Sequence, residues 1–175
     1  MELDVAVEAP WPTGQWEDLA ARAAAAAEQV APELGNARLS VSVLLTSDAE
    51  IHQLNREWRQ RDKPTNVLSF PMLARDDLLA LAADGPPELL GDVALAHETC
   101  AREAAEKGIP LADHAVHLIV HGLLHLAGHD HELSAEDADT MEALETKALA
   151  ICGIADPYGD TPRDREKAKG DARES

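Results

Sequence analysis

Three histidines in this 175-residue chain stand at a spacing that could bind a metal ion. His121 and His125 are four residues apart, and on a helix that spacing places two side chains on one face, one turn apart. Gly128 follows three residues later, and glycine commonly ends a helix in a left-handed turn. The chain can then reverse and bring His131 back over the same face. Three imidazoles with an open fourth position are the ligand set of a catalytic zinc site, so we expect one zinc ion per chain.

The spacing H-x-x-x-H-x-x-G-x-x-H is similar to that of metzincin proteases, with one omission. Those enzymes carry a glutamate, their general base, directly after the first histidine, and this chain has Gly122 there. Asp130 and His129 lie inside the motif and are candidates to orient an imidazole or to contact substrate. Asp130 also suits a turn. His114 and His117 continue the helical spacing upstream, and we expect them to be structural.

A second cluster of chemically active residues precedes the histidine motif. Four cations occupy eight positions of a chain whose net charge is −18, at Arg56, Arg59, Arg61 and Lys63. A run of charge is usually a solvated loop, but this one leads into a predicted strand, where functional residues tend to collect. A guanidinium beside a metal site would bind phosphate well. The cluster is therefore a candidate phosphate-binding loop.

Apolar periodicity predicts the elements that position these residues. Alternation predicts strands over 1–8, 38–46, 67–70 and 93–96, and helical spacing predicts helices over 16–31, 97–107 and 111–127. Ser47 and Ser134 each begin a further helix. The expected apolar faces of those two helices are Ile51, Leu54 and Trp58 in the first, and Met141, Leu144, Ala148 and Ile151 in the second. We therefore expect an α+β fold, a small sheet with about five helices and the metal site on a central helix that ends in a glycine turn.

Composition indicates one globular domain over 1–155, since 45% of the residues are apolar. Residues 75–88 are interpreted as an exposed insertion, and residues 156–175, which are polar and aperiodic, as a disordered charged tail. We find no secretory leader and no apolar run of about 18 residues, so we expect a cytoplasmic protein without a membrane partner. Cys100 and Cys152 are expected to be free thiols. The net negative charge argues against a protein that coats nucleic acid through a broad basic face, but it is compatible with a local basic cleft.

Three segments together resemble the YbeY family of bacterial metal-dependent endoribonucleases. They are R-x-x-D-K-P-T-N-V-L-S-F-P from Arg59, L-G-D-V from Leu90 and H-G-L-L-H-L-A-G-H-D-H from His121. They occur in the family's order, and the resemblance covers roughly residues 39–149. It implies zinc bound by His121, His125 and His131, and a functionally important arginine at Arg59.

The resemblance also implies a fold and a substrate. The fold would be a four-stranded mixed sheet with helices on it. The substrate would be single-stranded RNA, including the 3′ end of 16S ribosomal RNA in the small ribosomal subunit, with a role in ribosome quality control and ribosome-associated proteins as partners. The family often has tyrosine where this chain has His129, and residues 75–88 and the tail are longer than usual. Arg61 and Lys63 are further candidates to contact substrate.

The expected chemistry is metal-assisted phosphodiester hydrolysis, with Arg59 holding the phosphate. Whether water or the neighbouring 2′-hydroxyl attacks is open, and so is the general base. One alternative is a metallopeptidase with its base supplied by Glu98 or Asp130. Another is a ribosome-assembly factor with a structural zinc. Structural zinc usually has four protein ligands, often cysteines, and no cysteine lies near this motif, which favours an open site.

Overall fold

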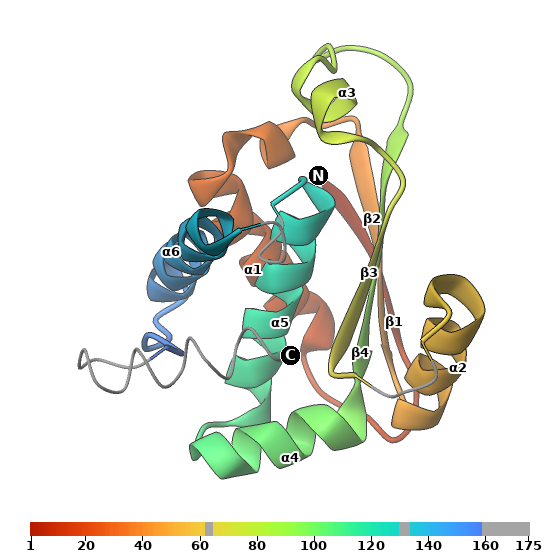
Figure 1. The fold of residues 1–175 in the computed structure, drawn as a ribbon, viewed down its shortest axis with the longest axis vertical. Coiled ribbons are helices and arrows are strands. Elements are labelled where there is room, and N and C mark those ends of the chain that lie inside the picture. The colour runs from red at the N-terminus through yellow and green to blue at the C-terminus, as the bar shows by residue number, and fades with distance from the viewer. Residues whose placement is uncertain (62–64, 130–133, 159–175) are drawn as a thin grey trace.

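The computed structural model describes residues 1–61, 65–129 and 134–158, and within them the chain forms one sheet with helices packed on it (Figure 1). The strands are β1 (Glu2–Val7), β2 (Leu39–Thr46), β3 (Val67–Pro71) and β4 (Glu88–Ala96). The helices are α1 (Trp16–Val30), α2 (Asp48–Arg59), α3 (Arg75–Leu79), α4 (His97–Lys107), α5 (Leu111–Leu126) and α6 (Ala135–Ile151), with a 3₁₀ turn η1 (Pro32–Gly35). This architecture confirms the predicted α+β class.

The sheet is mixed, as the family resemblance implies. Its strand order is β1-β2-β4-β3, with β1, β2 and β4 parallel and β3 antiparallel to β4. The strand β3 is therefore an edge strand, and its only partner in this sheet is β4.

Helices cover both faces of the sheet, and α5 lies at the centre of one of them (Figure 1). On that face α5 packs with α1 and α6, while α2 covers the opposite face. The strand β4 is buried on both sides: Val93 and Leu95 belong to the core with α1 and α5, whereas Ala94 packs with Ile51 of α2. No single helix of the described ranges is long and apolar enough to span a membrane, and α4 and α5, which pass that test as a pair, are bent by 115°.

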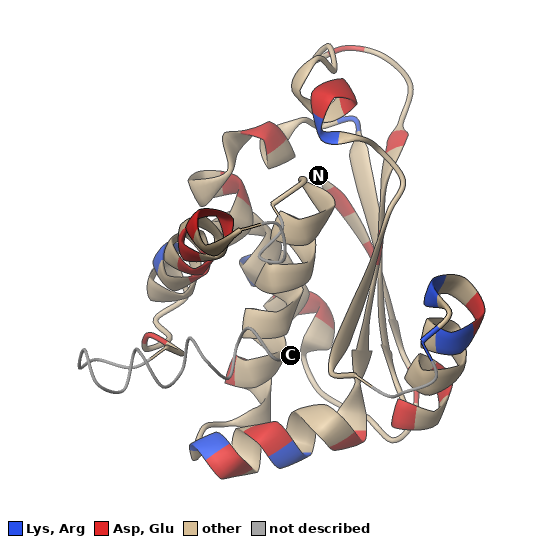
Figure 2. Ribbon diagram, in the orientation of Figure 1, with Lys and Arg blue, Asp and Glu red and all other residues tan. Residues whose placement is uncertain are grey.

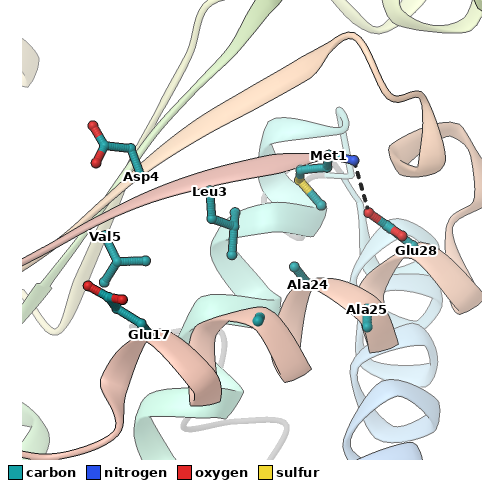
Figure 3. A pocket seen from close by; sticks show the side chains of 9 residues that line it. Met1, Leu3, Asp4, Val5, Glu17, Ala24, Ala25 and Glu28 are labelled. Carbon is teal, nitrogen blue, oxygen red and sulfur yellow. Dashed lines mark hydrogen bonds and ion pairs between the residues drawn. The ribbon is translucent and has the colours of Figure 1, made fainter.

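Small side chains bring α1 close to its neighbours. Five of its alanines are buried, namely Ala20, Ala23, Ala24, Ala26 and Ala27. Between α1 and the edge strand β1 runs a groove lined by Met1, Leu3 and Val5, with Glu28 accepting a hydrogen bond from the N-terminal amine at 3.3 Å (Figure 3). This groove lies beside β1, at the sheet edge opposite β3.

The segment 75–88 is not exposed throughout, contrary to the sequence prediction. It begins with α3, whose Leu78 is only 3% exposed, and β4 begins at Glu88, not at the predicted Val93. The first residues of β4 were not predicted to be a strand because the register of β4 against β2 shifts between Ser40 and Val41. The shift interrupts the alternation from which a strand is recognised.

Two residues of the predicted apolar faces lie outside the core. Trp58 is 72% exposed and Ile151 is 48% exposed. Each stands in the last turn of its helix, α2 or α6. The earlier positions Ile51 and Met141 are buried as predicted.

Both cysteines are free thiols, as predicted. Cys100 is buried and Cys152 is half-buried, and burial raises the pKa of both thiols. A protonated, sheltered thiol is a poor nucleophile and a poor metal ligand. The cysteines therefore belong to the packing of the domain.

Candidate metal and phosphate site

The helix α5 ends two residues before a glycine turn, as the sequence predicts. Gly128 has φ +98°, its N–H bonds to the carbonyl of His125 at 3.0 Å, and the N–H of His129 bonds to the carbonyl of Leu124 at 3.1 Å. This pair of bonds is a Schellman motif, which satisfies carbonyls left over at a helix end and favours glycine in the left-handed position. The turn reverses the chain directly after His125.

Arg75 fastens this helix end to the rest of the domain. Its Nη1 donates to the carbonyl of Ala127 at 2.6 Å, and its Nη2 pairs with Glu33 Oε2 at 3.0 Å. A Cβ at Gly128 would lie 2.7 Å from the Arg75 side chain, so space as well as backbone conformation requires glycine there. His129 is half-buried beside this contact, and burial together with the Arg75 charge lowers its pKa.

His125 is held by the edge strand β3. Leu68 of that strand is fully buried in the cluster with α2, so its neighbour Ser69 projects from the opposite face, toward α5. Ser69 Oγ lies 2.8 Å from His125 Nδ1. This contact orients the ring, and when Nδ1 carries the hydrogen the hydroxyl accepts it and leaves Nε2 able to bind a metal.

His121 is held by a buried carboxylate on α6. Its Nδ1 lies 2.6 Å from Glu145 Oε1, and Glu145 is only 1% exposed. A carboxylate bonded to one ring nitrogen of a metal-binding histidine is a common arrangement, because it orients the ring and makes the other nitrogen a better ligand.

Glu145 has further partners, which explain how a buried carboxylate is kept charged. Tyr158 donates its hydroxyl to Glu145 Oε2, and His117 Nε2 lies 3.6 Å from Oε1. Burial alone would raise the pKa of Glu145, but the charges and hydrogen bonds of His121 and His117 outweigh it and hold that pKa well below its usual range. Burial lowers the pKa of His117, and burial and the Glu145 charge raise the pKa of Tyr158. The phenol is therefore a donor throughout the neutral range.

Residues 156–158 are part of the domain, whereas the sequence prediction placed them in the tail. Besides the bond from Tyr158 to Glu145, the backbone N–H of Tyr158 donates to Asp156 Oδ1 at 2.8 Å. Thr146 of α6 donates to the same oxygen at 3.4 Å. A polar, aperiodic stretch looks dispensable from sequence, and the prediction was wrong here because a single tyrosine reaches a buried acid. Residues 159–175 lie outside the described ranges, so the predicted tail stays a prediction for them.

The variant Tyr158→Phe is expected to destabilise the domain by about 1–2 kcal/mol, because it removes a donor from a buried carboxylate. Its melting temperature, measured by circular dichroism against the parent, checks this. The matched control is Thr146→Val, which removes the longer bond to Asp156 and is expected to shift the melting temperature less. An unchanged melting temperature for Tyr158→Phe would show that Glu145 does not depend on the phenol.

His114, at the start of α5, is structural, as predicted. It is 1% exposed, and its Nε2 lies 2.9 Å from Glu103 Oε1 on α4. Asn66 donates to the same carboxylate oxygen at 3.0 Å, which ties the start of β3 to the two helices. His117 is structural in the same sense, since its partners are Glu145 and Tyr158.

The two described histidines of the predicted ligand set, His121 and His125, have ring orientations that would suit metal binding. In both His121 and His125 the Nδ1 atom is held by a fixed partner, so Nε2 is the nitrogen of each ring that would bind the metal. Within 1–61, 65–129 and 134–158 no three metal-binding side chains gather at one point. The predicted third ligand, His131, lies outside those ranges, as do Asp130 and Lys63.

Arg59 and Arg61 are exposed, and the structure does not bring them into contact with the histidine pair. Arg59 is the last residue of α2, on the face of the sheet opposite α5 (Figure 1). Figure 2 shows basic residues on α2, which covers one face of the sheet, whereas α4 and α6 carry most of their charge as acids. The edge strand β3 separates this basic end from His125, so an extended ligand would have to cross that edge to reach both.

Gly122 has a packing role that the sequence did not suggest. It is buried, and a Cβ there would lie 2.8 Å from Val93 Cγ1 of β4. A glutamate at this position would push α5 away from the sheet. Glu98, one of the two residues considered as a peptidase base, instead accepts from the backbone N–H of Asp48 at the start of α2.

Sequence reasoning missed the residues that hold the two histidines. Glu145 left a signal, since it stands four residues after the buried Met141 and three before the buried Ala148, an acid inside an apolar face. Ser69 left none, because its partner His125 lies 56 residues away along the chain, and Tyr158 left none, because it stands in a stretch whose composition resembles a tail. Arg75 was likewise hidden within the segment interpreted as an insertion.

Comparisons with known proteins identify the family and agree with the fold. Residues 8–153 match the family model described as Endoribonuclease YbeY. The chain is 66% identical over 160 residues to the Endoribonuclease YbeY of Erythrobacter litoralis, covering 91% of this chain and 99% of that one. It is 59% identical to the one from Novosphingobium aromaticivorans, covering 89% and 95%. A solution structure of a Thermotoga maritima protein has the same fold, with a TM-score of 0.54, 24% identity, and coverage of 91% and 97%. The chain therefore belongs to the YbeY family of endoribonucleases.

Proposed function

We propose that this protein is a zinc-dependent endoribonuclease that cleaves single-stranded ribosomal RNA. In this proposal His121, His125 and His131 bind one zinc ion, and Arg59 binds the phosphate. The substrate is the 3′ end of 16S ribosomal RNA on the small ribosomal subunit, in the cytoplasm, where the protein also takes part in ribosome quality control with ribosome-associated proteins. Family membership supports the endoribonuclease activity, and the substrate follows the family resemblance.

The observation that carries the zinc site is the fixed Nδ1 of each described histidine. Glu145 holds the ring of His121 at 2.6 Å and Ser69 holds the ring of His125 at 2.8 Å. Two imidazoles one helical turn apart, both anchored through the same ring atom, can offer their Nε2 atoms to one ion with little loss of side-chain entropy. The structural histidines His114 and His117 are instead held through Nε2.

The chain's own residues bind and orient the substrate. Arg59 ends α2, a helix that packs on β4 and β3, and its guanidinium is exposed to a ligand. A guanidinium can bind two phosphate oxygens at once and neutralise the charge that grows on them during cleavage. A bound zinc ion would supply Lewis-acid chemistry toward the phosphodiester.

At Gly122 and Glu98, the two described positions considered for it, the peptidase alternative finds no available acid–base group. Gly122 has no side chain and packs on Val93, and Glu98 bonds to the start of α2. A peptide nitrogen leaves poorly unless it is protonated, so a protease needs such a group. An alkoxide leaving group can be stabilised by a cation directly, which makes the phosphodiester the better substrate for this site.

The function is tested by assaying one zinc-loaded preparation on single-stranded RNA and on casein. We expect cleavage of the RNA and none of the casein. Double-stranded RNA of the same sequence is the matched control and should be cut much more slowly. A preparation free of contaminating protease that degrades casein and leaves RNA intact would overturn the proposal in favour of the peptidase.

A further inference from the structure

Trp58 differs from the other two tryptophans of the chain, all of which lie in the described ranges. Trp11 and Trp16 are 5% and 7% exposed and pack edge to face with ring centroids 4.9 Å apart. Trp58 is 72% exposed, in the last turn of α2. An indole buries a large apolar area when it is covered, so leaving it in water forgoes a substantial stabilisation.

Basic residues are concentrated in the turn of α2 that carries this exposed indole. Arg56 and Arg59 lie in the same last turn of α2, and Arg61 follows it, although the net charge of the whole chain is −18. The one acid of that turn, Glu57, accepts a hydrogen bond from Gln53 at 3.1 Å. Figure 2 shows these cations at the end of α2. An isolated exposed apolar side chain is ordinary, but an aromatic ring among cations has the chemistry of a surface that binds single-stranded nucleic acid.

The helix end that carries Trp58 is fixed in place. Ile51 and Asn55 of α2 are 0% and 1% exposed, so the helix is anchored on the sheet. Gln60 closes it in a left-handed conformation at φ 57°, and the backbone N–H groups of Gln60 and Arg61 both donate to the carbonyl of Asn55. A base that stacks here would meet a ring on a rigid support, which reduces the entropy lost on binding.

We propose that Trp58 is a stacking platform for a base of the single-stranded RNA whose phosphate Arg59 binds. This inference rests on the proposed function and adds a base-binding site to it. Base–aromatic stacking tolerates any sequence, because every base has a flat face, and it requires an unpaired base. A base held at Trp58 and a phosphate held at the adjacent Arg59 would direct the strand across the β3 edge toward Ser69 and His125. The preference for single strands would then arise partly from this ring.

The inference is tested by binding measurements, which do not depend on the metal or on cleavage. The probe is a short 2′-O-methylated oligouridylate, followed by fluorescence anisotropy of a label on the RNA. Trp58→Ala and Trp58→Leu are each expected to weaken binding about ten-fold, which is the size of one base–aromatic stack. Trp58→Phe is expected to bind within about two-fold of the parent, since it keeps a ring that can stack. The matched control, Ile151→Ala, removes another exposed apolar side chain and should bind as the parent does.

An oligomer of the same length without bases separates stacking from other contacts. This oligomer should bind the parent more weakly than the base-bearing RNA does. It should bind Trp58→Ala and the parent with equal affinity. Equal affinity of Trp58→Ala and the parent for the base-bearing RNA would overturn the inference and leave the proposed function standing. The same holds if Trp58→Leu binds as well as the parent. A parent that neither binds nor cleaves single-stranded RNA would overturn both, and circular dichroism melts establish that each variant is folded.

Discussion

The variant His125→Ala is expected to purify without zinc and to cleave single-stranded RNA at least 100-fold more slowly than the parent. Removing one of three ligands leaves two, and metal affinity falls by more than the 10- to 100-fold typical of losing a partner that only orients a ligand. The fold should survive, because His125 is only half-buried and its loss leaves Ser69 Oγ one hydrogen bond short, about 1 kcal/mol. Elemental analysis of the folded variant measures the metal directly.

Two further variants make this prediction specific. Ser69→Ala removes the support of His125 Nδ1 and keeps the imidazole, so we expect roughly ten-fold weaker metal binding. His129→Ala changes the neighbouring histidine of the same motif and should retain most of the zinc. Full zinc occupancy in His125→Ala would show that the histidine pair does not bind the metal.

The variant Arg59→Glu is expected to keep its fold and metal and to lose RNA cleavage by at least 100-fold. Loss of one group that stabilises the transition state typically costs that much, and the introduced carboxylate also repels the phosphate. Arg59 is exposed at the C-terminal end of α2, where an acid opposes the helix dipole by only about 0.3–1 kcal/mol. Cleavage rates at saturating zinc, together with a thermal melt, measure both parts of the expectation.

The matched control for Arg59→Glu is Arg102→Glu. Arg102 is exposed on α4, away from the end of α2, and the substitution makes the same change in net charge. We expect its cleavage rate to stay within about two-fold of the parent, apart from the general electrostatic effect that salt screens. Equal losses in the two variants would mean that net charge matters and that Arg59 has no particular role.

Local patterns made much of the fold predictable. Alternation located β1 and β2, because the buried Leu39, Val41, Val43 and Leu45 stand on one face of a strand whose other face is less buried. The capping serines were also readable, and Ser47 and Ser134 accept from the backbone N–H groups of Glu50 and Asp137 as expected. Each of these signals depends on residues only a few positions apart, so it can be recognised in one sequence without the structure.

The supports of the site were not predictable, because they depend on how distant segments meet. Ser69 contacts His125 only because Leu68 turns to the other face of the sheet and β3 pairs at the edge. Tyr158 reaches Glu145 from a stretch whose composition looks disordered. Gly122 appeared to be a missing catalytic residue, and the close approach of Val93 gives it a role in packing.

For Trp58 the sequence predicted the helix correctly and the environment of the side chain wrongly. Its spacing from Ile51 and Leu54 suits an apolar face, yet in the last turn of α2 it is 72% exposed. The spacing of apolar residues predicts the direction in which a side chain points, and it does not predict whether another element covers that side chain. A stacked base, as proposed for the RNA, would cover this ring.

The most direct test is the rate of single-stranded RNA cleavage before a chelator removes the metal, after removal, and after zinc is returned. We expect cleavage to stop in the metal-free protein and to recover with zinc in the parent, and not to recover in His125→Ala. Circular dichroism before and after chelation controls for unfolding of the metal-free chain. Undiminished RNA cleavage by a protein shown by elemental analysis to contain no metal would contradict the assignment of His121 and His125 as ligands of a catalytic ion.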